Sequence, residues 1–144
     1  MHQLVYLSRA RRAFTQDDLV QLCARSASKN AGNHVTGLLL YDGKRFMQAL
    51  EGEEPAVRAA MRRIEDDPRH YNIDYLTDRP IENRRFGDWA MDFKPAASGC
   101  CSREFLQKVK EDVAQVQDPE LQAAFIGFAL LASARPAGYR CTAG

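Results

Sequence analysis

The chain has 144 residues, near the usual size of one compact domain, and is long enough to bury a core without disulfides or a structural metal. Hydrophobic residues make up 45% and charged residues 27%, which excludes a disordered chain and a coiled coil. The formal net charge is only +1, so there is no overall electrostatic signal for nucleic acid or for an anionic membrane surface.

The N-terminal third predicts a strand and then a helix. A short apolar and aromatic run over residues 4–7 predicts a first strand over about residues 2–8, which ends at an Arg-rich loop. Thr15 and Asp18 form a capping-box signature, and apolar residues at helical spacing then continue to about residue 29. Asn30 ends the core-facing stripe of this helix, so an amide is expected to face the core.

A β-hairpin follows. Residues 35–41 and 45–50 are two strand-like runs that flank Asp42 and Gly43, and this dipeptide favours a tight turn. Because side chains alternate along a strand, Gln48 shares a face with the core residues on either side of it. The hairpin therefore predicts a second amide among core side chains.

The next segment predicts a helix and two more strands. Pro55 suits the first turn of a second helix, which ends near residue 66. Residues 71–76 alternate as a fourth strand, and residues 86–93 read as a fifth, with Trp89 and Met91 on one face.

The βαββαββ order over residues 1–94 is typical of a ferredoxin-like α+β fold, a mixed sheet with both helices on one face. Val5 and Leu7 make the opposite face of the first strand apolar, so a second layer is needed. Two apolar helices expected within residues 95–144 can supply it. We therefore predict a domain over residues 1–94 and a C-terminal helical extension that packs on the sheet.

Signals for export, a membrane span, metal binding and common catalytic motifs are lacking. Residues 123–134 are the most apolar stretch, well short of the roughly 20 residues that span a bilayer. The N-terminus has no basic leader, which predicts a cytoplasmic protein with reduced thiols. No nucleotide, hydrolase or zinc motif is present, and the three histidines are scattered, so no metal site is expected.

Three polar residues at core-facing positions are the main chemical signal: Tyr6, Asn30 and Gln48. Burying each of them costs free energy unless a hydrogen-bond partner is present. They could simply bond to one another or to the backbone. A phenol beside two amides could also bind the carbonyl and N–H edge of a flat heteroaromatic ligand between the two helices.

Six ordered blocks extend this signal: LVYLS at 4–8, Asn30, VTGLLLY at 35–41, FMQALEG at 46–52, DPRH at 67–70 and RFGDWAMDF at 85–93. Together they resemble the BLUF family of blue-light sensors using flavin, over about residues 2–94. The resemblance implies a photoreceptor that binds FAD without a covalent bond, with FMN or riboflavin as alternatives.

The resemblance also implies a role for each matching residue. Tyr6 would donate an electron and a proton to the photoexcited ring, and Gln48 would be the switch between Tyr6 and the ring. Asn30 would hold the polar edge of the ring. Lys29 departs from the family pattern, in which Asn or His is common, so the ring contact expected there is either lost or remade by its ammonium near a ring carbonyl. The remaining implied residues are the flavin contacts Arg63, Asp67, Arg69 and His70 and the fifth-strand relay residues Trp89 and Met91.

The combined interpretation is a short, non-enzymatic photoreceptor. Three forms of output are expected as alternatives: binding of an unidentified protein partner, a change of oligomeric state such as formation of a homodimer, or rearrangement of the C-terminal helices. Neither nucleic acid nor a membrane is expected as a partner. Two alternatives stay open on the residues alone: a small ferredoxin-like flavoenzyme and a ligand-free interaction domain.

Overall fold

The computed structural model describes residues 1–85, 92–95, 102–114, 116 and 118–133. The elements are β1 (His2–Ala10), α1 (Gln16–Gly32), β2 (Thr36–Tyr41), β3 (Arg45–Gly52), α2 (Glu54–Glu65), β4 (His70–Pro80), β5 (Asp92–Pro95), α3 (Ser102–Val113) and α4 (Pro119–Ser133). The five strands form one mixed sheet in the order β4-β1-β3-β2-β5, in which only β2 and β5 are parallel. The predicted ferredoxin-like βαββαββ arrangement is confirmed.

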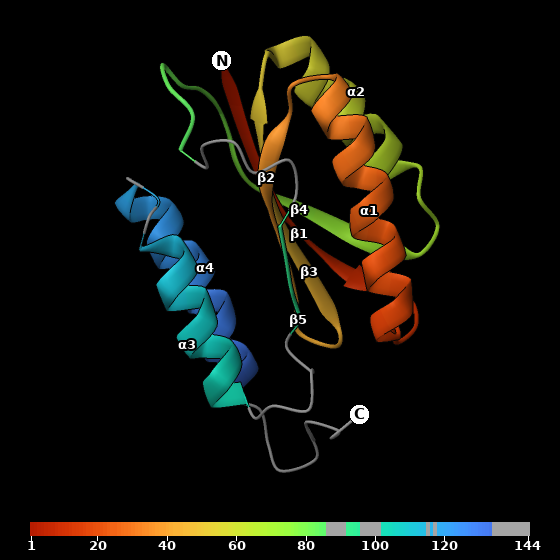
Figure 1. The fold of residues 1–144 in the computed structure, drawn as a ribbon, viewed down its shortest axis with the longest axis vertical. Coiled ribbons are helices and arrows are strands. Elements are labelled where there is room, and N and C mark those ends of the chain that lie inside the picture. The colour runs from red at the N-terminus through yellow and green to blue at the C-terminus, as the bar shows by residue number, and fades with distance from the viewer. Residues whose placement is uncertain (86–91, 96–101, 115, 117, 134–144) are drawn as a thin grey trace.

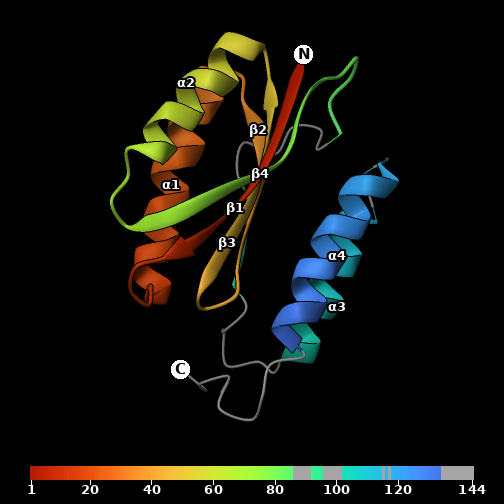
Figure 2. The ribbon, with the colours of Figure 1, turned by 180° about the vertical axis from the view of Figure 1, so that it is seen from behind.

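The sheet lies between two helical layers (Figures 1 and 2). Helices α1 and α2 cover one face, where Leu4, Leu50 and Val57 belong to one buried cluster. The other face carries Val5 and Met47, and it packs against α3 and α4. The central strands are apolar on both faces, and such strands need cover on both sides. The prediction that the C-terminal helices cover the Val5 face is confirmed.

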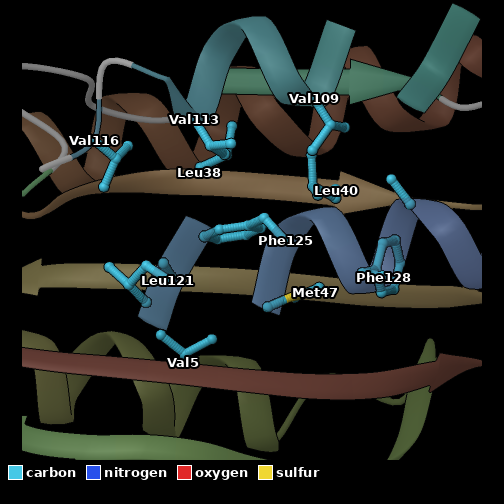
Figure 3. Close-up of a cluster of buried hydrophobic side chains, with 12 residues drawn as sticks. Val5, Leu38, Leu40, Met47, Val109, Val113, Val116, Leu121, Phe125 and Phe128 are labelled. Atoms are coloured by element: carbon cyan, nitrogen blue, oxygen red, sulfur yellow. The ribbon is translucent and has the colours of Figure 1, made fainter. Parts of the chain in front are cut away.

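Figure 3 shows the second of these layers in detail. Side chains of α3 and α4 point toward β2 and β3 and form a cluster with them. Its strand members are Val5, Leu38, Leu40, Met47 and Ala49, its helix members are Val109, Val113, Leu121, Phe125, Phe128 and Ala129, and Val116 joins it from the link between α3 and α4. A contiguous buried core of this kind is a main source of folding free energy.

Several element boundaries differ from the predicted ones. β1 runs two residues and β4 four residues past the predicted C-terminal end, because the two strands pair with each other from His2 opposite Pro80 to Ala10 opposite His70. The predicted strand over 86–93 is described only at its end, where β5 begins at Asp92. Its first six residues lie outside the described part of the chain.

A polar network joins the sheet to the start of α4. Gln3 Nε2 donates to the buried Glu51 Oε2 at 2.9 Å, and Arg79 Nε donates to Gln3 Oε1 at 3.0 Å. Arg79 Nη2 also donates to Asp118 Oδ2 at 2.7 Å. Asp118 in turn accepts from the backbone N–H of Leu121, which caps α4. The network fixes where α4 begins relative to β1, β3 and β4.

Over the described residues, every helix is too short or too polar to reach across a bilayer.

Candidate functional site

Tyr6 on β1 and Gln48 on β3 lie directly opposite each other in the antiparallel ladder. The alternation of side chains along each strand puts both on the face covered by α1 and α2. Both are buried, at 3% and 5% exposure, and the Tyr6 hydroxyl donates a hydrogen bond to Gln48 Oε1. Two of the three polar residues predicted at core-facing positions are therefore partners.

The environment of Tyr6 keeps its proton on the phenol. Burial raises the pKa of Tyr6 far above its usual range, and the negative charge of Asp67 raises it further. The neutral phenol is therefore the resting form, and it stays a hydrogen-bond donor.

This pKa shift predicts a stability difference at alkaline pH. In the unfolded chain Tyr6 releases its proton near pH 10, whereas in the folded protein it does not, so the stabilisation is complete below pH 10 and declines above it. Above pH 10 the free energy of unfolding of the wild type should therefore fall faster than that of Tyr6→Phe, by up to about 1.4 kcal/mol per pH unit. Urea unfolding of both proteins at about pH 8 and about pH 11 measures this. Equal losses in the two proteins would contradict it.

A cleft opens beside the Tyr6–Gln48 pair, between α1, α2 and the sheet. Its inner part encloses about 440 Å³ and its outer part about 660 Å³ of space, both open to solvent. The inner part is lined by Tyr6, Phe14, Leu22, Ser26, Leu39, Phe46, Gln48, Ile64, Asp67, Arg69 and His70. Six of these also line the outer part, so the two are continuous.

Asp67 and Arg69 lie in the loop between α2 and β4 and line both parts of the cleft. Arg69 donates from Nε at 2.9 Å and from Nη2 at 2.6 Å to the Asp67 carboxylate. These bonds hold the pKa of Asp67 below its usual range. Asp67 therefore stays ionised and keeps its paired guanidinium in a fixed position on the cleft wall.

His70 lies in the inner wall, but both of its ring nitrogens already have protein partners. Nδ1 is 2.8 Å from Ser8 Oγ, and Nε2 contacts the backbone oxygen of Ile64. Its ring lies 6.4 Å from that of Tyr6. A ligand in the cleft would therefore meet the carbon face or edge of His70.

The other predicted site residues fall in three places. Lys29 and Arg63 line the outer part of the cleft and are exposed. Asn30 belongs to the last part of α1, and its side chain is outside what the structure describes. Trp89 and Met91 are also outside the described residues.

Two cleft residues on α1, Leu22 and Ser26, were missed by the sequence interpretation, although both line each part of the cleft. They precede Lys29 at helical spacing, so all three lie on one face of α1. That periodicity could have indicated them.

Within the described part of the chain, no group of His, Cys, Asp or Glu side chains could hold a metal ion.

Comparison with known proteins identifies the family. The model of the BLUF family, "Sensors of blue-light using FAD", matches residues 1–92. The chain is 37% identical over 89 residues to the blue light- and temperature-regulated antirepressor BluF of Escherichia coli (strain K12). It is 33% identical over 89 residues to the photoactivated adenylate cyclase subunit beta of Euglena gracilis. These matches cover 62% and 61% of this chain but only 22% and 10% of the relatives.

Solved structures agree with this match. The dark state structure of BlrB, a BLUF protein, superimposes with a TM-score of 0.68 at 32% identity, covering 92% of this chain and 96% of that one. A manganese and cyclic-diGMP complex of Klebsiella pneumoniae BlrP1 gives 0.73 at 30% identity, covering 88% and 32%. The resemblance predicted from the sequence is confirmed, and the chain belongs to the BLUF family, the sensors of blue light using FAD.

Proposed function

We propose that this chain is a blue-light photoreceptor that holds FAD in the cleft between α1, α2 and the sheet. The observation that carries the proposal is the buried hydrogen bond from Tyr6 to Gln48 in the wall of that cleft. A phenol and an amide at one end of an otherwise largely apolar pocket form a hydrogen-bonding unit that a bound ring can complete.

The lining residues fit a flavin. Leu22, Leu39 and Ile64 offer apolar surface to the faces of a flat ring. Gln48 and the Asp67–Arg69 pair offer donors and acceptors to its polar edge. Asn30 is a further proposed ring contact, on the resemblance alone.

When bound, a flavin supplies absorption of blue light and an acceptor for an electron. Tyr6 holds the proton at its hydroxyl oxygen and shares it with Gln48 Oε1, so it is placed to give up an electron and that proton. The Gln48 amide can exchange its donor and acceptor ends with almost no change in volume. The transfer of the electron and proton can therefore change the hydrogen bonds of Gln48 without changing the packing of the core.

We propose that the signal leaves through β3. Gln48 faces the cleft, whereas its neighbours Met47 and Ala49 face α3 and α4 in the other buried cluster. A movement of β3 at Gln48 would therefore also move the adjacent residues that contact α3 and α4, because close-packed regions transmit strain.

In this proposal residues 1–94 are the sensor and residues 95–144 the helical extension through which it acts on a protein partner. The chain itself catalyses no reaction. The relay role of Trp89 and Met91, the homodimer and the cytoplasmic location stay predictions.

A light-minus-dark absorption spectrum of the protein purified with flavin tests the proposal. We expect a yellow protein whose absorption shifts reversibly to the red under blue light without an added electron donor. Bleaching that requires an electron donor would instead favour the flavoenzyme alternative. A colourless protein would favour the ligand-free interaction domain.

A further inference from the structure

A second buried polar pair lies on the two strands that carry Tyr6 and Gln48. Gln3 on β1 is directly opposite Glu51 on β3, and both residues are fully buried. Gln3 comes three residues before Tyr6, and its partner on β3 comes three residues after Gln48. Because side chains alternate along a strand, this odd separation puts the second pair on the other face of the sheet, which α3 and α4 cover. The two polar pairs therefore share the same adjacent strands, on opposite faces.

The amide of Gln3 has only one orientation that satisfies its partners. Its Nε2 donates to Glu51 Oε2 at 2.9 Å, and its Oε1 accepts from Arg79 Nε at 3.0 Å. Rotating the amide by half a turn would place its N–H groups against the guanidinium and its oxygen against the carboxyl oxygens, so both bonds would be lost. Gln48 differs, because a phenol can donate to an amide oxygen or accept from an amide N–H. The Gln3 amide is therefore a fixed connection across β3, β1 and β4, whereas the Gln48 amide can switch.

Arg79 extends this connection to the start of α4. Its Nη2 donates to Asp118 Oδ2 at 2.7 Å. The other carboxylate oxygen, Oδ1, accepts from the backbone N–H groups of Glu120 and Leu121 in the first turn of α4. Figure 2 shows that α4 begins at the end of the sheet where β1 begins. The Asp118 carboxylate therefore holds the helix with one oxygen and the sheet with the other.

The buried bonds of this connection are much harder to break than its exposed bond. Arg79 also pairs with Glu120 at 3.0 Å, but the Glu120 side chain is 80% exposed, and exposed ion pairs contribute little. The Asp118 side chain is only 7% exposed, and a buried group that loses its partner has a large desolvation penalty. The apolar contacts of α4 are non-directional, so on their own they would let the helix slide on the sheet. The polar connection fixes the position of the helix along the sheet.

Resting on the proposed photoreceptor function, we infer that Gln3, Arg79 and Asp118 are positioning residues that couple the light switch to α4. A new hydrogen-bond pattern at Gln48 displaces β3 relative to β1. Gln3 bridges the same strands on the other face, and its fixed amide passes the displacement through Arg79 to the first turn of α4. The start of α4 is therefore the element that the switch regulates.

Amide hydrogen exchange of the flavin-loaded full chain, measured by mass spectrometry in the dark and under blue light, tests the coupling. In the wild type, illumination should speed exchange in peptides that cover the start of α4, because a displaced first turn opens more often. The change should be about two- to tenfold, which is the equilibrium effect of one hydrogen bond.

Two variants break the connection. Asp118→Asn separates the connection from the helix cap, because asparagine caps a helix as well as aspartate does but carries no charge for Arg79. Gln3→Met removes both bonds of the fixed amide at similar volume. Each variant should keep the red shift and lose the light-induced change in α4. If Gln3→Met does not fold, the milder Asp118→Asn decides the result.

Glu120→Gln is the matched control. It removes the exposed partner of the same Arg79 guanidinium, two residues from Asp118. It should match the wild type both in the red shift and in the exchange of α4. A merely structural role of Asp118 predicts that Asp118→Asn speeds exchange equally in the dark and in the light and keeps the difference between them. That result would overturn the coupling.

The two proposals fail in different ways. A wild-type protein that shows the red shift but has the same exchange of α4 in the dark and in the light would overturn the coupling and leave the photoreceptor function standing. A wild-type protein without the red shift would overturn both. Loss of the α4 response in Asp118→Asn, with the red shift retained, would support both.

Discussion

Replacing Tyr6 by Phe should abolish the reversible red shift under blue light and leave the protein yellow. The substitution keeps the buried ring but deletes the hydroxyl that donates to Gln48, so no phenolic electron and proton donor remains at this position. Absorption difference spectra measure the loss, and flavin fluorescence should last longer because its main quencher is gone. Gln48→Leu, which removes the amide, should also stay yellow and lack the shift.

Tyr75→Phe is the matched control. Tyr75 lies opposite Tyr6 on β4 but is exposed, and its hydroxyl contacts Glu65 outside the cleft. Deleting that hydroxyl should leave the red shift intact. A normal red shift in that variant would show that Tyr6 is not the donor.

Phe125→Ala should cost about 3–5 kcal/mol in the free energy of unfolding, a large share of the roughly 5–15 kcal/mol that stabilises a typical domain. Phe125 is fully buried and belongs to the cluster in which α3 and α4 pack on Val5, Leu38 and Met47. Removing the ring leaves a cavity in the centre of that layer. Urea unfolding, with the denaturant slope compared between proteins, measures the cost.

Leu130→Ala on the same helix separates packing from helix propensity. Leu130 is 46% exposed, so its truncation should cost less than about 1 kcal/mol. If both variants were equally mild, α4 would not be packed on the sheet as described.

Local pattern determined much of this protein. The alternation along residues 35–41 and 45–50 predicted the β2–β3 hairpin, and Gly43 indeed adopts a φ of 97° in its turn. The same alternation put Gln48 on one face of its strand with Phe46 and Leu50, and it put Val5 on the face of its strand opposite Tyr6. These features depend on residues a few positions apart, which is why the sequence alone can specify them. The six ordered motifs likewise predicted the BLUF family from the sequence alone.

Only the tertiary structure decided how distant segments complete the site. The cleft joins one face of α1 to Arg63 on α2, and His70 uses both of its nitrogens on Ser8 and Ile64. The full lengths of β1 and β4 follow from their pairing with each other. Arg79 reaches Asp118 from 39 residues away. Such contacts depend on strand register and helix packing, which are fixed by the sum of many long-range interactions and leave no periodic signal in the chain.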